Sequence, residues 1–115
     1  MTQGPPQIGY DDFLKVDVRV GRIVQVDDFP KARKPAYRLR IDFGELGVKT
    51  SSAQLTQHYR KEELAHRLVL AVVNFPPRQI ADYFSEVLTL GVMLDEGDVV
   101  LVQPDRDVAL GSRIL

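Results

Sequence analysis

Residues 16–26 of the 115-residue chain read VDVRVGRIVQV, and the prediction of the fold begins from them. Valines recur there with a period of two, at Val16, Val18, Val20, Val24 and Val26, while Asp17, Arg19 and Gln25 face the other way. Such alternation is typical of an extended strand with one buried face. Gly21 interrupts it, and a glycine inside a strand often marks a bulge or a sharp bend. We therefore predict a long, bent first strand, as a small closed barrel requires.

The rest of the chain predicts further short strands and little helix. Strands are expected at residues 37–43, 48–51, 68–73, 88–94 and 99–102, with a candidate terminal strand at 112–115. Helical turns are expected at Asp11-Asp12, at residues 53–55 after a Ser52 cap, and at residues 60–66. One helical interruption after the third strand favours an all-β, five-stranded Greek-key barrel, the OB-fold. An SH3-like barrel or a small sandwich would give much the same pattern.

Composition indicates one small globular domain. The chain is 44% hydrophobic and has no cysteine, so it has neither disulfides nor thiolate metal sites. Its first residues lack the features of a signal peptide, and its longest apolar run, residues 68–73, is far shorter than the ~20 residues of a membrane span. We expect a cytoplasmic protein without membrane insertion.

Charge is balanced in total but not along the chain. The net charge of -1 argues against coating nucleic acid through bulk charge. Five basic residues and no acid occur in one segment, at Lys31, Arg33, Lys34, Arg38 and Arg40. Acids dominate residues 95–107. The pattern predicts a polarised molecule.

Motifs of catalysis and of metal or cofactor binding are missing. His58 and His66 are eight residues apart and have no metal-site spacing, and no nucleophile elbow, P-loop or dinucleotide fingerprint is present. We expect a binding protein rather than an enzyme, with no catalytic residue, metal or cofactor.

Residues 74–86, NFPPRQIADYFSE, are the most informative segment for function. Two prolines predict a rigid loop. Large apolar side chains in a connection either cover the barrel end or face a partner, and both interpretations stay open. Two smaller features are candidates as well. The basic loop at residues 31–34 either holds phosphates, with Tyr37 stacking on a base, or is simply solvated, with Tyr37 in the core. Ser51 is a candidate to face a ligand.

The chain resembles the tRNA-binding domain family from about residue 13 to residue 115. The resemblance is carried by VDVRVG at residues 16–21, Asp42-Phe43-Gly44, Asn74, Pro77, Arg78, Ser85-Glu86 and Gly111. Within that family, residues 31–37, 49–54, 74–79 and 85–88 are similar to stretches of small export-related chaperones.

The resemblance implies an organisation and a function. Residues 1–12 would be an N-terminal extension with a short helical turn. Residues 13–115 would be a tRNA-binding-type OB-fold domain that includes C-terminal extension strands, and the extensions would join a homodimer. The chaperones bind unfolded or precursor polypeptides and assist protein export, whereas the wider family binds tRNA by its structure.

Site residues follow from the same resemblance. Polypeptide contacts are expected at Lys49, Ser51, Phe75, Arg78, Tyr83 and Phe84. Contacts to tRNA, the alternative ligand, are expected at Arg33, Lys34, Asn74, Arg78, Ser85 and Glu86. The tRNA-binding relatives usually have Lys where Gln79 stands, Gly where Tyr83 stands, and Gly-Met where Val87-Leu88 stands. These departures remove a cation and make the site more apolar, which favours polypeptide.

Overall fold

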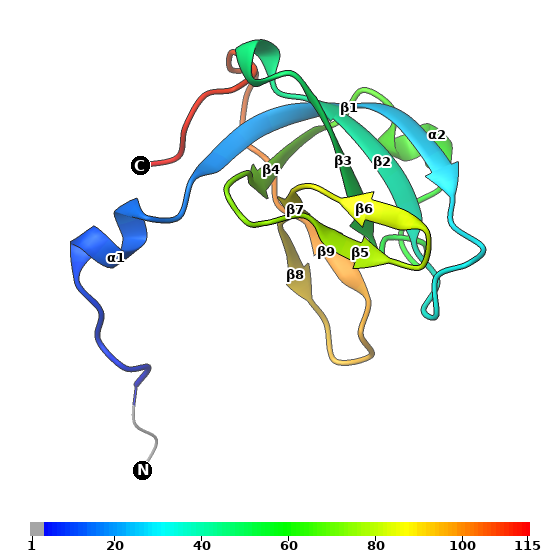
Figure 1. The fold of residues 1–115 in the computed structure, drawn as a ribbon, viewed down its shortest axis with the longest axis horizontal. Helices are drawn as coiled ribbons and strands as arrows, with labels where there is room; N and C mark the ends of the chain where they lie inside the picture. Colours follow the sequence, from blue (N-terminus) through cyan, green and yellow to red (C-terminus); the bar gives the residue numbers. More distant parts are fainter. Residues whose placement is uncertain (1–3) are drawn as a thin grey trace.

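The structure is a computed structural model that describes residues 4–115. Its centre is a five-stranded antiparallel sheet that curls into a barrel, with strand order β3-β2-β1-β4-β7 (Figure 1). These strands are β1 (Val18–Asp28), β2 (Tyr37–Asp42), β3 (Val48–Ala53), β4 (Leu68–Val72) and β7 (Leu88–Thr89). The all-β OB-fold predicted from the sequence is confirmed.

Two hairpins and three short helical segments complete the described chain. The hairpins are β5 (Arg78–Ile80) with β6 (Tyr83–Ser85) and β8 (Gly91–Met93) with β9 (Val99–Leu101). The helical segments are α1 (Tyr10–Leu14), α2 (Lys61–Leu64) and the 3-10 turn η1 (Gly44–Leu46). Residues 74–86, expected as an irregular rigid loop, therefore contain a regular β-hairpin.

Strand β1 bends, but not at Gly21. Gly21 pairs regularly with Val69 of β4, whereas the register with β2 shifts between Ile23 and Gln25. The shift changes which side chains face inward: Ile23 is fully buried and Val24 is 45% exposed. The predicted bulge position and the predicted burial of Val24 are therefore wrong.

Gly21 has a packing role instead. A Cβ built on Gly21 would lie 2.5 Å from Ile41 Cγ2 and 2.7 Å from Phe43 Cε1. Both neighbours are fully buried in the core. A glycine here lets the large Phe43 ring lie directly against the backbone of β1.

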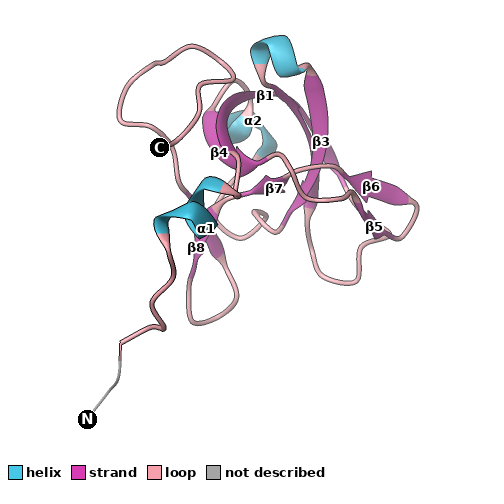
Figure 2. Ribbon diagram, turned by 60° about the vertical axis from the view of Figure 1, so that its left-hand side comes forward, coloured by secondary structure: helices cyan, strands magenta, loops and turns pink. Residues whose placement is uncertain are grey.

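Helix α2 fills one end of the barrel (Figure 2). Its Leu64 is fully buried, and Ile23 exchanges backbone hydrogen bonds with the segment after the helix, through His66 and Arg67. Tyr37 is also buried, and its hydroxyl donates to the Tyr59 carbonyl over 2.9 Å. Tyr37 thus belongs to the core and is no stacking platform.

The expected helix at residues 53–55 is absent, because β3 continues through Ala53. Ser52 pairs with Arg38 in the sheet, and its N–H donates to Ser85 Oγ rather than beginning a helix. The helix predicted at residues 60–66 is present in shorter form as α2.

Both ends of the described chain leave the barrel near the start of β1. Helix α1 lies away from the barrel, and the C-terminal tail runs beside β1 (Figure 1). The tail bonds to β1 through Gly111 N–H to the Val20 carbonyl and Ile114 N–H to the Val18 carbonyl. The predicted boundary after residue 12 falls inside α1. Among residues 4–115, no helix is long and apolar enough to cross a membrane.

Candidate functional site

An open groove of about 1110 Å³ lies on one side of the barrel. Four segments line it: the basic loop at residues 31–34, the end of β3 at residues 52–55, the β5–β6 hairpin at residues 78–81, and residues 88–91 of β7 and β8. Single residues Ala36, Met93, Val99 and Leu101 complete the lining. Elements far apart in the sequence thus form one surface, hereafter the groove.

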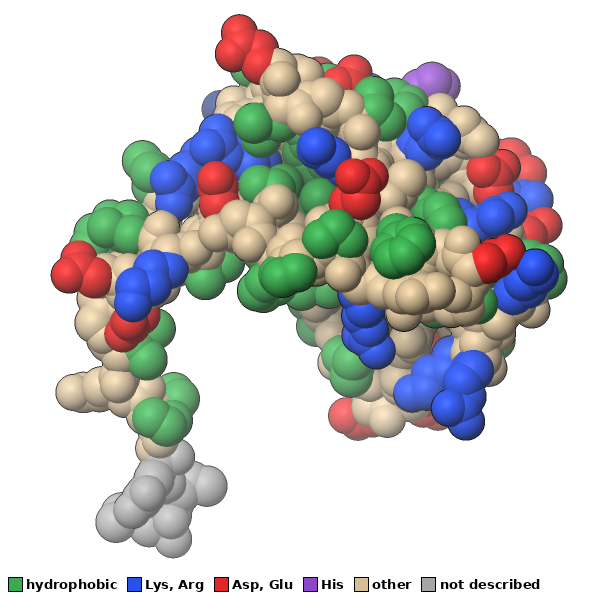
Figure 3. Space-filling view, in the orientation of Figure 1, with side chains coloured by type: hydrophobic (Ala, Val, Ile, Leu, Met, Phe, Trp, Pro, Cys, Tyr) green, Lys and Arg blue, Asp and Glu red, His purple; other side chains and the backbone are tan. Residues whose placement is uncertain are grey.

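The groove has an apolar floor and a basic rim. Apolar side chains include Ile80, Leu88 and Met93, of which Leu88 is 49% and Met93 75% exposed. Its charged lining residues are all basic, namely Lys31, Arg33, Lys34 and Arg78. Lys and Arg side chains gather on the molecular surface below the hairpin (Figure 3). The arrangement can bind an apolar chain that carries anionic groups.

The tip of the β5–β6 hairpin is fastened to the basic loop. Lys31 Nζ lies 2.9 Å from Asp82 Oδ2, and this hydrogen bond lowers the pKa of the Asp82 carboxyl. Beside it the Tyr83 ring packs edge-on against Phe29, with centroids 5.4 Å apart. Arg38 lies over both rings, 5.7 Å and 5.8 Å from their centroids. The hairpin therefore forms one fixed wall of the groove.

Tyr83 joins this wall of the groove to the central sheet. Its hydroxyl donates to the Leu39 carbonyl over 3.2 Å, and burial raises the pKa of the phenol. The ring thus anchors the hairpin to β2.

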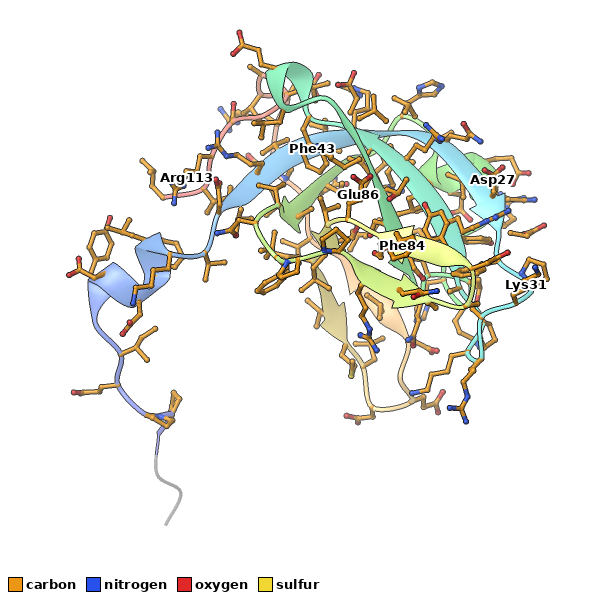
Figure 4. All side chains as sticks on the ribbon, in the orientation of Figure 1. Asp27, Lys31, Phe43, Phe84, Glu86 and Arg113 are labelled. Carbon is orange, nitrogen blue, oxygen red and sulfur yellow. The ribbon has the colours of Figure 1, made fainter. Side chains whose placement is uncertain are left out.

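The base of the hairpin is fastened to β3 by Ser85 and Glu86. Glu86 Oε1 accepts hydrogen bonds from Thr50 N–H and from Thr50 Oγ1, each 3.0 Å long. Ser85 Oγ accepts from Ser52 N–H over 3.0 Å and donates to the Val87 carbonyl over 3.2 Å. Figure 4 shows Glu86 at the base of the hairpin and Lys31 beyond its other end.

Asn74 joins the N-terminal segment to the end of β4. Its Oδ1 accepts from Asp17 N–H over 3.0 Å, and its Nδ2 donates to the Lys15 carbonyl over 2.7 Å. Asp17 in turn pairs with Arg19 and Arg113, which together lower the pKa of its carboxyl, Arg19 contributing most. Asn74, Ser85 and Glu86 thus each hold backbone in place, and their contacts to tRNA stay a prediction.

The predicted site residues divide into two groups. Arg33, Lys34 and Arg78 line the groove together. Phe75 and Phe84 are 51% and 56% exposed but do not line it, and neither does Lys49. Figure 4 places Phe84 on the hairpin, apart from the basic loop. A single groove that contains both the cations and these aromatic residues is therefore not found, and polypeptide contacts at Phe75, Tyr83, Phe84 and Lys49 stay a prediction.

Ser51 does not face a ligand. It has no exposed surface, and its Oγ lies 2.8 Å from Thr89 Oγ1. Its hydroxyl is used to join β3 to β7 beneath the groove, so the expectation of direct contact is wrong.

The apolar floor is the part that the sequence did not reveal. The alternation of residues 88–94 predicts a strand with a buried face, yet Leu88, which lines the groove, is 49% exposed. A strand that packs in the core and a strand that lines a binding surface show the same alternation of apolar residues. Only the exposed area of their side chains tells the two apart.

The expected separation of charge is only partial. Lys34 lines a second, smaller hollow together with Glu96 and Asp98 of the β8–β9 turn. Asp98 also lies 3.4 Å from His58 Nε2. Residues 4–115 contain no cluster of three or more His, Cys, Asp or Glu that could hold a metal ion.

Known proteins are similar to the chain in both sequence and structure. A family model described as "Putative tRNA binding domain" matches residues 18–113. The crystal structure of the chaperone CsaA from Bacillus anthracis has a TM-score of 0.92 and 47% identity, covering 96% of this chain and 100% of that one. The CsaA chaperone protein of Picrophilus torridus has a TM-score of 0.87 and 50% identity over 95% of this chain and 100% of that one.

Similarity also extends to a part of much longer proteins. The methionine–tRNA ligase of Pyrococcus abyssi is 38% identical over 108 residues, which are 93% of this chain. The chain spans about 14% of the length of that relative. The chain is similar along nearly its whole length to the CsaA chaperones. The family match over residues 18–113 and the shared barrel show that the chain belongs to the tRNA-binding domain family.

Proposed function

We propose that the chain binds unfolded or precursor polypeptides in the groove and serves protein export as a cytoplasmic homodimeric chaperone. The observation that carries the proposal is the groove itself, whose apolar floor is exposed and whose rim is basic. Two similar solved structures, at 47% and 50% identity, are named as chaperones. A role in binding also agrees with the lack of a catalytic motif in the sequence.

The chemistry of the groove suits an unfolded chain. Such a chain exposes apolar side chains that a folded protein would bury, and each gains by leaving water. Leu88, Ile80 and Met93 offer apolar surface of this kind along the groove. The groove is open along its length, so an entering segment needs no free end.

A homodimer is supported by apolar side chains outside the barrel. Tyr10 and Leu14 of α1 are 67% and 40% exposed, and Leu115 is 86% exposed. Exposed apolar groups on an extension that does not cover its own barrel suit a second copy of the chain.

Two variants test where polypeptide binds. Replacing Ile80 and Leu88 with Ser removes apolar lining, and we expect the affinity for an unfolded precursor to fall about tenfold. Phe84→Ser is the matched control, because it removes a large exposed apolar group from the same hairpin outside the groove. Fluorescence anisotropy with a labelled precursor measures both, and melting curves verify folding. Full affinity in the groove variant with a loss in Phe84→Ser would place the site on the outer face of the hairpin.

Binding of tRNA is a second candidate function, favoured by the family match over residues 18–113 and by the cations Arg33, Lys34 and Arg78. It predicts affinity for tRNA that falls steeply with salt. Each of these cations changed to Gln should lower the log–log salt slope by about one unit. Absence of binding at low salt would count against it, and competition between tRNA and a bound precursor would show whether they share the groove.

A further inference from the structure

The groove lies over a seam at which the barrel is not closed by backbone hydrogen bonds. Strands β3 and β7 are the two edges of the sheet and do not pair with each other. Near its middle β3 is covered, because the Thr50 carbonyl accepts from the N–H groups of Glu86 and Val87. Beyond Ser52, whose N–H is held by Ser85 Oγ, the described chain supplies no further partner strand for this edge.

The open part of the seam coincides with the groove. Ser52, Ala53 and Gln54 form one wall, and Leu88, Thr89 and Leu90 form the facing wall. The hydroxyls of Ser51 and Thr89 meet at its bottom. The apolar floor beside these walls suits apolar side chains of a ligand, and the cations of the rim suit its acidic side chains.

The rim has a net positive charge. Lys31 is neutralised by Asp82, but in the part of the chain that the structure describes Arg33, Lys34 and Arg78 make no ion pair. Glu96 and Asp98 line the adjoining hollow with Lys34 and do not line the groove. A ligand with carboxylates would complement these cations, whereas one rich in Lys or Arg would be repelled.

We propose that the groove selects polypeptide segments that combine carboxylates with apolar side chains. This inference rests on the proposed polypeptide binding and adds the class of segment. Apolar side chains lie on the floor, and carboxylates meet Arg33, Lys34 and Arg78. Segments that combine apolar side chains with lysine or arginine bind more weakly, even when equally apolar.

Three labelled peptides of equal length and identical apolar residues test the selectivity, with Glu, Gln or Lys at alternate positions. We expect the Glu peptide to bind about fivefold more tightly than the Gln peptide, and the Lys peptide to bind most weakly. These differences in affinity should shrink in about 0.5 M salt, because salt screens exposed charges. Equal affinities would overturn the selectivity and leave polypeptide binding intact. No binding of any peptide would overturn the proposed function as well.

Protein variants assign the selectivity to the rim. In Arg33→Gln with Arg78→Gln, the preference for the Glu peptide over the Gln peptide should fall from about fivefold to below about twofold, because two of the three unpaired rim cations are lost. Arg106→Gln is the matched control, since Arg106 is exposed and outside the groove. A preference for Glu that survives the double variant would overturn the assignment.

Discussion

At the scale of single residues, side chains that suggest recognition of tRNA make internal hydrogen bonds. Asn74, Ser85 and Glu86 each bind backbone groups of distant segments. Thr50 is the clearest example, because both its N–H and its hydroxyl lie 3.0 Å from one Glu86 oxygen. Ser85 and Glu86 hold the hairpin that forms one wall of the groove, so a change at either residue can affect binding through the shape of the groove.

Glu86→Ala tests this role. The change removes both hydrogen bonds to Thr50 and leaves a partly buried N–H without an acceptor, so we expect a loss of about 1–3 kcal/mol in the free energy of unfolding. Urea denaturation measures it. Glu45→Ala in η1 is the control, because Glu45 is exposed and should change stability little. Unchanged stability of Glu86→Ala together with lost tRNA affinity would show a direct contact instead.

At the scale of elements, β1 is shaped by what packs beneath it. Gly21 pairs regularly, and its missing side chain makes room for Ile41 and Phe43. Figure 4 shows Phe43 under the curved strand. The missing side chain of Gly21 therefore lets a core ring approach the backbone of β1 closely.

Gly21→Ala should destabilise the barrel. The added methyl group overlaps two fully buried side chains, so overpacking should cost about 1–3 kcal/mol. A lower urea midpoint is the expected result. Gly4→Ala, where a Cβ meets nothing within 4 Å, is the matched control. Equal midpoints for both variants would contradict the packing role of Gly21.

At the scale of the whole molecule, the N-terminal and C-terminal extensions are the segments that lie outside the barrel. Helix α1 lies apart from the barrel and exposes Tyr10 and Leu14. The C-terminal tail differs, because its backbone is bonded to β1 of the same chain. The two extensions therefore call for different tests, since deleting the tail would also disturb the barrel.

Replacing Tyr10 and Leu14 with Ser tests the proposed dimer while leaving the barrel intact. We expect the double variant to sediment as a monomer where the unchanged chain sediments as a dimer, because the apolar contact of the extension is lost. Leu46→Ser is a matched control, since Leu46 is 41% exposed on η1. A dimer that persists in the double variant would exclude α1 from the interface.

The all-β fold class could be predicted from the sequence, since alternating valines and turn residues specify strands locally. It also identified the basic loop and Arg78, because charge is visible in a sequence. Residues 88–94 show the limit of prediction from the sequence, because a buried face and an exposed groove floor have the same alternation of apolar residues.

The site could not be predicted from the sequence, because a groove is formed by segments that lie far apart in the chain and meet only when it folds. It moved the register shift two residues past Gly21, buried Ser51, and engaged Asn74, Ser85 and Glu86 in internal hydrogen bonds. It also brought Arg33, Lys34 and Arg78 to one rim above the exposed Leu88. The local pattern of the sequence specifies which residues form strands. Long-range contacts decide which side chains make internal hydrogen bonds and which remain free for a partner.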